Sequence, residues 1–247
     1  MRDVMIVTGG SRGIGRATCL GAAEAGYDVI VNWASDERAA AKTVDDCGER
    51  GARAVAVHAD VADESAVAAM FDRAEELGPL RVLVNNAGIL HQQMRFDEMT
   101  VDRWRAMIDV NIIGAFICAR EAAQRMSTRH GGTGGSIVNV SSASAYLGSP
   151  GEYVDYAATK GAIDTLTIGL GRELAAEDVR VTGVRPGVIL TDIHASGGEP
   201  DRAHRVAPGV PMQRPGTPDE VAATVLWLAS DAASYVTAAT IDCSGGR

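Results

Sequence analysis

A tyrosine and a lysine four residues apart are the clearest candidates for chemistry in this sequence, in the run Tyr156-Ala157-Ala158-Thr159-Lys160. In a helix, this spacing places both side chains on one face. A free phenol has a pKa of about 10 and is a poor base at neutral pH, but a nearby ammonium favours the phenolate and lowers that pKa. The pair is therefore a candidate for general acid–base catalysis, which works best when the pKa lies near the working pH.

The alternative is a helix that carries one tyrosine and one lysine on its surface by chance. Composition argues against this, because Lys42 and Lys160 are the only lysines among 23 Lys and Arg residues. An arginine is a planar, permanently charged fork and could not replace a compact ammonium in this role. The pattern favours the catalytic interpretation, and the surrounding sequence has to support it.

Length and composition describe a globular chain: 247 residues, 46% hydrophobic and 22% charged, which fits one large α/β domain or two small ones. The net charge of −9 argues against nucleic acid as the main partner, since nucleic acid calls for a basic face. The four cysteines, Cys19, Cys47, Cys118 and Cys243, form no metal-binding spacing and indicate free thiols in a reducing compartment.

No uncharged apolar run reaches the ~18 residues that a membrane span requires. The chain passes from Met1-Arg2-Asp3 directly into an apolar segment, which leaves no room for a signal peptide. We therefore expect a cytoplasmic protein with no membrane partner and no metal.

A glycine-rich segment, residues 8–15, follows an apolar strand at 4–7 and precedes an Ala- and Leu-rich helix at 16–25. Glycines allow a tight turn and a close approach to phosphate, and the helix N-terminus offers free N–H groups. A glycine cluster alone is a weak signal in a chain with 28 glycines, where it can be an ordinary strand–helix turn. The strand before it and the helix after it favour a dinucleotide site.

Strands and helices alternate along the rest of the chain, which predicts a parallel sheet with helices on both faces. We expect a single α/β domain over residues 1–247, a Rossmann-type doubly wound sheet of seven parallel strands. Ligands of such sheets bind at the carboxyl ends of the strands, where Thr8, Asp60 and Asn86 fall. The expected strands are 4–7, 28–32, 53–58, 81–84, 136–142, 179–184 and 239–243, and the expected helices are 16–25, 39–50, 65–77, 101–126, 156–177 and 219–229.

Five motifs in this order resemble the short-chain dehydrogenase/reductase family, and the resemblance runs from Thr8 to Gly246. It is closest to the group that contains 3-oxoacyl-[acyl-carrier-protein] reductases and glucose dehydrogenases. The motifs are Thr8-Gly9-x-x-x-Gly13-x-Gly15, Asn85-Asn86-Ala87-Gly88, Asn111-x-x-Gly114, Tyr156-x-x-x-Lys160 and Pro186-Gly187.

The resemblance implies an NAD(P)(H)-dependent oxidoreductase that interconverts a small-molecule carbonyl and a secondary alcohol. In the family, Tyr156 would be the general acid/base, Lys160 would bias its pKa and bind the nicotinamide ribose, Ser142 would bind the carbonyl oxygen, and Asn111 would hold a water of the proton relay. The interval from Ser142 to Tyr156 is one residue longer than usual in the family, so Ser141 and Ser144 stay open. Family members are commonly homotetramers packed through the two long helices.

The resemblance also implies a cofactor site formed by the strand ends and by the catalytic pair. Its members are Gly9, Ser11, Arg12, Gly13, Ile14, Gly15, Asn32, Asp60, Val61, Asn86, Ala87, Gly88, Tyr156, Lys160, Pro186, Gly187, Val188, Ile189 and Thr191.

The end of the second strand bears on the choice of cofactor. An NAD enzyme of this type usually places an acid there, which binds the ribose hydroxyls and repels a 2′-phosphate. Here the first acid is Asp36, whereas Arg12 could give a 2′-phosphate bidentate donors, with Arg38 as a second charge. Asn32 and Ser35 could add neutral hydrogen bonds. We predict NADP(H) rather than NAD(H); inward rotation of Asp36 and Glu37 would favour NAD(H).

The substrate stays open. Arg125, Arg129 and Arg172 could form a landing patch for an acidic acyl carrier or could be solvated surface residues. A polar, Gly- and Pro-rich stretch at about 191–214 is predicted to be a substrate lid, with 194–210 poorly ordered until ligands bind. Two alternative functions remain: an oxidative sugar or polyol dehydrogenase, and a catalytically silent nucleotide-binding sensor on the same fold.

Overall fold

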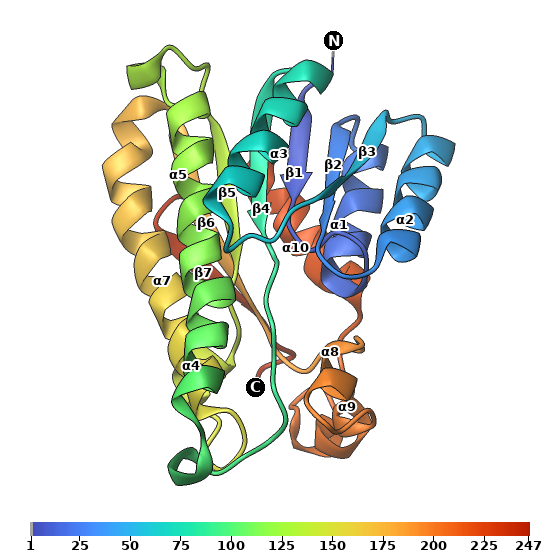
Figure 1. Ribbon diagram of the computed structural model, residues 1–247, viewed down its shortest axis with the longest axis vertical. Helices are drawn as coiled ribbons and strands as arrows, with labels where there is room; N and C mark the ends of the chain where they lie inside the picture. Colours follow the sequence, from blue (N-terminus) through green and yellow to red (C-terminus); the bar gives the residue numbers. More distant parts are fainter. Residues whose placement is uncertain (1) are drawn as a thin grey trace.

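The computed structural model describes residues 2–247, which form a seven-stranded sheet in the order β3-β2-β1-β4-β5-β6-β7 (Figure 1). All neighbouring strands are parallel. This confirms the predicted doubly wound fold. The strands are β1 Val4–Val7, β2 Asp28–Trp33, β3 Ala54–His58, β4 Leu80–Asn85, β5 Gly135–Val140, β6 Val179–Pro186 and β7 Ala239–Cys243.

Helices cover both faces of the sheet. The helices are α1 Gly13–Glu24, α2 Glu37–Glu49, α3 Glu64–Leu77, α4 Val101–Ile108, α5 Ala115–Met126, α6 Ser144–Leu147, α7 Val154–Leu174, α8 Ile193–Ser196, α9 Arg202–Val206 and α10 Pro218–Ala229. Helices α1, α2 and α10 lie on one face, and α3, α5 and α7 on the other (Figure 1).

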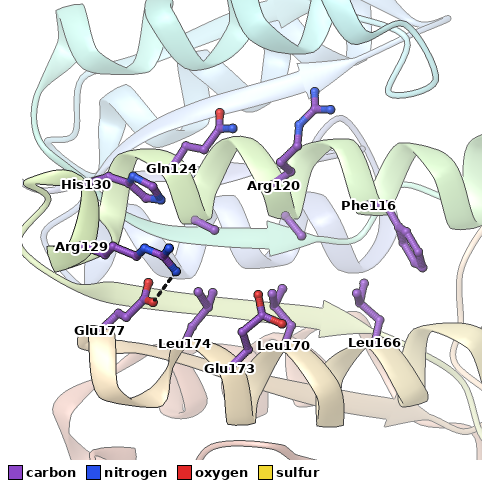
Figure 2. Close-up of a pocket in the computed structure, with 12 residues that line it drawn as sticks. Phe116, Arg120, Gln124, Arg129, His130, Leu166, Leu170, Glu173, Leu174 and Glu177 are labelled. Atoms are coloured by element: carbon purple, nitrogen blue, oxygen red, sulfur yellow. Dashed lines mark ion pairs between the residues drawn. The ribbon is translucent and has the colours of Figure 1, made fainter.

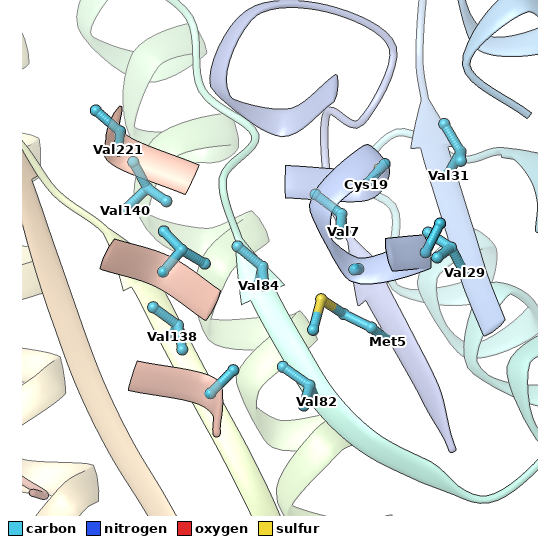
Figure 3. Packing of buried hydrophobic residues seen from close by; sticks show 14 of the residues in the cluster. Met5, Val7, Cys19, Val29, Val31, Val82, Val84, Val138, Val140 and Val221 are labelled. Atoms are coloured by element: carbon cyan, nitrogen blue, oxygen red, sulfur yellow. The ribbon is translucent and has the colours of Figure 1, made fainter. Parts of the chain in front are cut away.

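Two hydrophobic cores lie on opposite faces of the sheet because successive side chains of a strand point in opposite directions. In β1, Met5 and Val7 pack into the core beneath α1 and α10, and Val4 and Ile6 pack into the core beneath α3 and α5. Figure 3 shows the first core, where Met5 of β1 lies between the valines of β2 on one side and those of β4 and then β5 on the other. Burial on both faces explains why the strands appear in the sequence as continuous apolar runs.

The helix boundaries differ from the predicted ones by up to three residues, and two differences from the predicted helices bear on the site. Helix α1 begins at Gly13, three residues before the predicted start, so the glycine-rich turn leads directly into the first helical turn. The predicted helix 101–126 is continuous but contains a π-helical segment, Asp109–Gly114, between α4 and α5. Such wide turns are frequent at functional sites because they rotate side chains out of the regular helical register.

Of the helices in the described residues, none has the length and apolarity needed to cross a bilayer. Residues 2–247 also contain no group of three or more His, Cys, Asp or Glu side chains placed to hold a metal ion.

Candidate active site

The glycine-rich turn after β1 forms a cradle that side chains would fill. Gly9 and Gly13 have φ values of +63° and +53°, which favour glycine. A Cβ on Gly15 would lie 2.2 Å from the Gly9 carbonyl oxygen, so only a glycine fits there. Because α1 starts at Gly13, its free N–H groups face this turn, and the arrangement fits the diphosphate of a dinucleotide.

Polar side chains join the ends of β1 and β4 beneath that cradle. The Asn86 amide donates to the Thr8 carbonyl at 2.8 Å, and the Thr8 hydroxyl accepts from the backbone N–H groups of Asn86 and Ala87 at 2.9 and 3.0 Å. A Cβ on Gly9 would lie 3.1 Å from the Ala87 Cα. The Asn-Asn-Ala-Gly motif therefore holds the glycine-rich turn against the end of the central strand β4.

Asn32 has a different local role from the one predicted. Its side chain is 2% exposed and accepts from the Gly9 N–H at 3.1 Å, while its amide donates to the Ala59 carbonyl at 2.9 Å. It thus ties the glycine-rich turn to the end of β3 and does not point toward solvent as a phosphate donor would.

Near the end of β2, the acidic group is turned to a helix N-terminus and two arginines are exposed, an arrangement that suits a bound phosphate. Asp36 is the N-cap of α2 and accepts from the Ala39 N–H at 2.9 Å, so its carboxylate is directed along the helix. Arg12 and Arg38 are exposed, and neither forms an ion pair within residues 2–247. Two guanidinium groups are therefore free to bind an anion at this edge.

The remaining predicted cofactor residues lie at neighbouring strand ends. Asp60 follows β3 and is exposed, its carboxylate accepting from the Ala62 N–H at 3.0 Å. The Gly187 N–H donates to the Cys243 carbonyl at 3.0 Å, at the end of β6. Thr191 lies against the glycine-rich turn, since a Cβ on Gly13 would be 3.3 Å from its methyl carbon.

Tyr156 and Lys160 share one face of α7, as predicted. The Lys160 side chain is buried, and its ammonium nitrogen lies 5.6 Å from the centre of the Tyr156 ring. That nitrogen donates to the Val140 carbonyl of β5 at 2.9 Å. The ammonium is therefore held at the carboxyl end of the central strands, close to Gly88 and Asn111.

Burial dominates the titration of both side chains. It raises the pKa of Tyr156 to about 12, and the Ser142 hydroxyl and the positive charge of Arg202 act in the opposite direction. Burial lowers the pKa of Lys160 to about 8, opposed by the Asp164 carboxylate. The expected lowering of the Tyr156 pKa by Lys160 is therefore not seen in this structure, because burial outweighs nearby charge and the Lys160 ammonium is directed at a carbonyl of the sheet.

The three candidate serines separate clearly in space. Ser142 is the one whose hydroxyl acts on the Tyr156 phenol by hydrogen bonding. The Ser141 hydroxyl is buried and donates to the Lys160 carbonyl at 3.2 Å, beneath the site. Ser144 begins α6, and its N–H donates to the Ser142 hydroxyl oxygen at 3.1 Å.

Asn111 lies in the π-helical segment and is 1% exposed. Its amide donates to the Ile89 carbonyl at 3.1 Å and to the Thr159 hydroxyl at 3.2 Å, and its oxygen accepts from the Ile89 N–H at 2.8 Å. Asn111 thereby connects the loop after β4 with α7, between Tyr156 and Lys160.

Sequence reasoning missed an ion pair that supports the catalytic helix. Arg103 of α4 donates to both Asp155 oxygens, at 2.6 and 3.3 Å, and both side chains are nearly buried. The Asp155 carboxylate also accepts from the Tyr156 N–H at 2.9 Å. A carboxylate next to Tyr156 in the first turn of a helix was visible in the sequence, but its partner lies 52 residues away.

The predicted lid segment folds over this site. It contains α8, α9 and a 3₁₀ turn, Ala207–Gly209, and it contacts the loop after β4 and the loop before α7. The predicted disorder of residues 194–210 without ligands stays a prediction.

A family model described as enoyl-(acyl carrier protein) reductase matches residues 9–247. The chain is 52% identical over 247 residues to the uncharacterized oxidoreductase YgfF of Escherichia coli (strain K12), with 99% of each chain covered. It is 37% identical to the 3-oxoacyl-[acyl-carrier-protein] reductase FabG of Staphylococcus aureus (strain Mu50), covering 100% of this chain and 98% of that relative.

Among solved structures, the fold is similar to an acetoin dehydrogenase, YohF, from Salmonella typhimurium. The TM-score is 0.87 at 35% identity, and the match covers 100% of this chain and 97% of that one.

Proposed function

The chain belongs to the short-chain dehydrogenase/reductase family, and from that premise we propose that Tyr156 is the general acid/base of its reaction. The protein is an NAD(P)-dependent oxidoreductase that interconverts a carbonyl and an alcohol. The observation that carries the proposal is the position of the Tyr156 phenol, with the Ser142 hydroxyl beside it and the Lys160 ammonium on the same face of α7.

The nicotinamide cofactor, when bound, donates or accepts the hydride. Tyr156 donates its proton to the substrate carbonyl oxygen in reduction and takes it back in oxidation. Ser142 hydrogen-bonds that oxygen and fixes its distance from the phenol. Lys160 supplies positive charge beneath the phenol, and Asn111 links the site to the loop after β4 and, through a bound water, to solvent.

A direct test is carbonyl-dependent consumption of NADPH, measured in both directions at neutral pH. The proposal predicts turnover with at least one small ketone or aldehyde. Faster oxidation of a sugar or polyol than reduction of any carbonyl would favour the oxidative dehydrogenase. Cofactor binding without turnover on a broad panel would overturn the catalytic assignment.

As a member of this family, the protein is proposed to prefer NADP(H), held by the residues predicted above at the strand ends except Asn32, whose side chain bonds Gly9 and Ala59. The support is electrostatic: Asp36 caps α2, and Arg12 and Arg38 are exposed without ion pairs within residues 2–247. A guanidinium binds a 2′-phosphate with bidentate hydrogen bonds.

The measurement is the ratio of kcat/KM with NADPH to that with NADH. We expect a ratio above one in the wild type and a fall of about ten- to a hundredfold in Arg12→Ala, mostly through KM, since a hydrogen bond to a charged group contributes about 1.5 to 3 kcal/mol. Arg73→Ala, an exposed arginine of α3, is the control. A wild-type preference for NADH, or an unchanged ratio in Arg12→Ala, would contradict the proposal.

The substrate is a small carbonyl or alcohol, and its identity is not fixed by these residues. The structure argues against Arg125 as part of a landing patch for an acidic acyl carrier. Its guanidinium forms ion pairs with Asp72, Glu75 and Glu121 and is not free to attract another anion.

We also propose that the protein is a homotetramer, in part through the surface between α5 and α7. Figure 2 shows a groove there, with Phe116 at one end and Leu166, Leu170 and Leu174 along its floor. Exposed apolar side chains on two long helices suit a contact with a second copy of the chain. A cytoplasmic location remains an expectation.

A further inference from the structure

The lid is fastened to the active site on two sides. On one side, the Gln93 side chain donates to Glu199 at 2.6 Å and the Gln93 N–H donates to the Gly197 carbonyl at 3.2 Å. On the other side, the Tyr153 hydroxyl donates to the same Gly197 carbonyl at 3.2 Å. Tyr153 is 3% exposed and directly precedes α7, three residues ahead of Tyr156.

Ion pairs reinforce the second side. Glu152 accepts from Arg202 at 2.6 Å and from Arg205 at 3.4 Å, and Arg205 also pairs with Glu199. The two arginines belong to α9 of the lid, whereas Glu152 belongs to the loop that starts the catalytic helix. Closing the lid therefore brings two cations to the N-terminal end of α7.

The two arginines have different surroundings. The Arg202 side chain is 12% exposed, and its guanidinium lies 5.4 Å from the centre of the Tyr153 ring, the arrangement of a cation–π contact. Its Nε is buried and has no partner in the described part of the chain. The Arg205 side chain is 53% exposed. Only Arg202 thus places a desolvated charge within the site.

We propose that Arg202 is a positioning residue for proton transfer: the closing lid carries its guanidinium onto Glu152 and Tyr153 and so places a positive charge at the N-terminal end of α7, one helical turn ahead of Tyr156. The inference rests on the proposed role of Tyr156. The Arg202 charge reaches the N-terminal end of α7 only when the lid is closed. Lid closure therefore also prepares Tyr156 for proton transfer.

The titration of Tyr156 agrees with this geometry. Arg202 opposes the burial that raises the pKa of Tyr156, whereas the Lys160 ammonium is directed at the Val140 carbonyl. The other charged or titratable groups around this end of α7 are Asp155 with its partner Arg103, His194 of α8, Arg247, and Glu152, Glu199 and Arg205 of the ion-pair cluster. Arg103 and Asp155 belong to α4 and α7, outside the lid, whereas the buried guanidinium of Arg202 belongs to α9 of the lid and moves with it.

The first test is the pH dependence of kcat/KM for alcohol oxidation, which rises with pH as Tyr156 loses its proton. Removing a cation destabilises the phenolate, so Arg202→Gln should move this limb to higher pH by about 0.5 to 1 unit. Arg202→Lys keeps a charge and should largely restore the limb. Arg205→Gln, the matched control on the same helix, should leave the limb in place and change mainly KM. The proposal would be overturned if Arg202→Gln and Arg205→Gln lost equal activity and neither shifted the pH dependence of kcat/KM. That result would mean that both arginines only hold the lid in place.

The second test separates closure from charge and uses no substrate. A Cβ on Gly197 would lie 2.5 Å from the Tyr153 hydroxyl oxygen and 3.1 Å from a Leu90 methyl, so Gly197→Ala should keep the lid from seating. A Cβ on Gly209, in the same lid, meets nothing within 4 Å, and Gly209→Ala is the control. Hydrogen exchange of residues 194–210, with NADPH present, should be faster in Gly197→Ala and in Arg202→Gln than in the wild type and Gly209→Ala.

The pH profile and the hydrogen exchange together distinguish failure of this proposal from failure of the proposed function. Gly197→Ala should also shift the pH limb in the direction of Arg202→Gln. Faster exchange without a shifted limb in either variant would overturn the proposal. A wild-type protein with no turnover on any carbonyl would instead refute the proposed function, and the exchange data would then still show whether Arg202 fastens the lid.

Discussion

At the residue scale, Lys160 is held in a position that costs stability. The residue is 4% exposed, its ammonium has one hydrogen bond to the Val140 carbonyl, and burial lowers its pKa to about 8. A charge is kept in this environment because the proposed chemistry needs it beside Tyr156.

The lowered pKa predicts a pH-dependent stability. Between pH 8 and about 10.5, the unfolded chain binds the Lys160 proton more tightly than the folded protein does, so wild-type stability rises with pH in this window. Relative to Lys160→Met, which lacks the group, the wild type should gain about 2 to 3 kcal/mol of unfolding free energy from pH 7 to pH 10. Urea unfolding at both values measures it, and a difference that does not change with pH would contradict the stated burial effect.

Lys42, the other lysine of the chain, provides the control. It lies on α2 with 69% of its side chain exposed and pairs with Asp46. Lys42→Met, measured under the same conditions, reports the general effect of removing a lysine.

Sequence patterns predicted Tyr156 and Lys160 and where they lie, but not the direction of the Tyr156 pKa. Spacing along a helix determines which side chains are neighbours, while burial depends on the loops that pack over them. The order of the serines illustrates the same limit: Ser141 and Ser142 are adjacent in sequence, and only the strand end determines that one faces the Lys160 carbonyl and the other the phenol.

At the scale of elements, the ion pair between α4 and α7 anchors the catalytic helix. Arg103 also donates to the Gln92 carbonyl at 2.6 Å, so one guanidinium joins α4, the first turn of α7 and the loop after β4. Breaking a buried pair from one side leaves an uncompensated charge.

We therefore predict that Arg103→Leu lowers the unfolding free energy by about 3 kcal/mol and reduces kcat, because Asp155 also accepts the Tyr156 N–H. The double variant Arg103→Leu with Asp155→Leu should recover most of the stability but not kcat. Thermal unfolding and kcat of both variants check this. Equal stability of the single and double variants would show that the pair is not coupled.

Element boundaries were predicted less well than element order. The sequence indicated one helix from 101 to 126, but it did not reveal the π-helical segment Asp109–Gly114, whose extra residue rotates the side chains out of the regular helical register. The pairing of Arg103 with Asp155 was equally hidden, since the sequence does not show which turns of two distant helices meet.

At the scale of the whole molecule, the alternation of strands and helices predicted the parallel, doubly wound sheet, whereas the strand order is known from the structure. Assembly is also not determined by this alternation. The exposed side chain of Phe116, which lines the groove between α5 and α7, would be covered by a second copy.

We predict that Leu170→Asp, on the floor of the α5–α7 groove, converts the tetramer to a smaller species. A buried unpaired carboxylate in an apolar contact opposes association strongly. Glu49→Lys, at the exposed end of α2, is the control. Light scattering after size exclusion measures the mass, and an unchanged mass for Leu170→Asp would place the interface elsewhere.

The central claim is that Tyr156 transfers the proton, and single-turnover reduction by NADPH tests it most directly. Tyr156→Phe removes the phenol hydroxyl and nothing else, while Tyr153→Phe removes the hydroxyl that bonds Gly197 of the lid. Loss of a general acid costs about 10²- to 10⁴-fold, so Tyr156→Phe should fall by at least that factor with NADPH binding intact. Tyr153→Phe should keep most of the rate. Equal losses in the two variants, or a Tyr156→Phe protein that reduces carbonyls at the wild-type rate, would contradict the account.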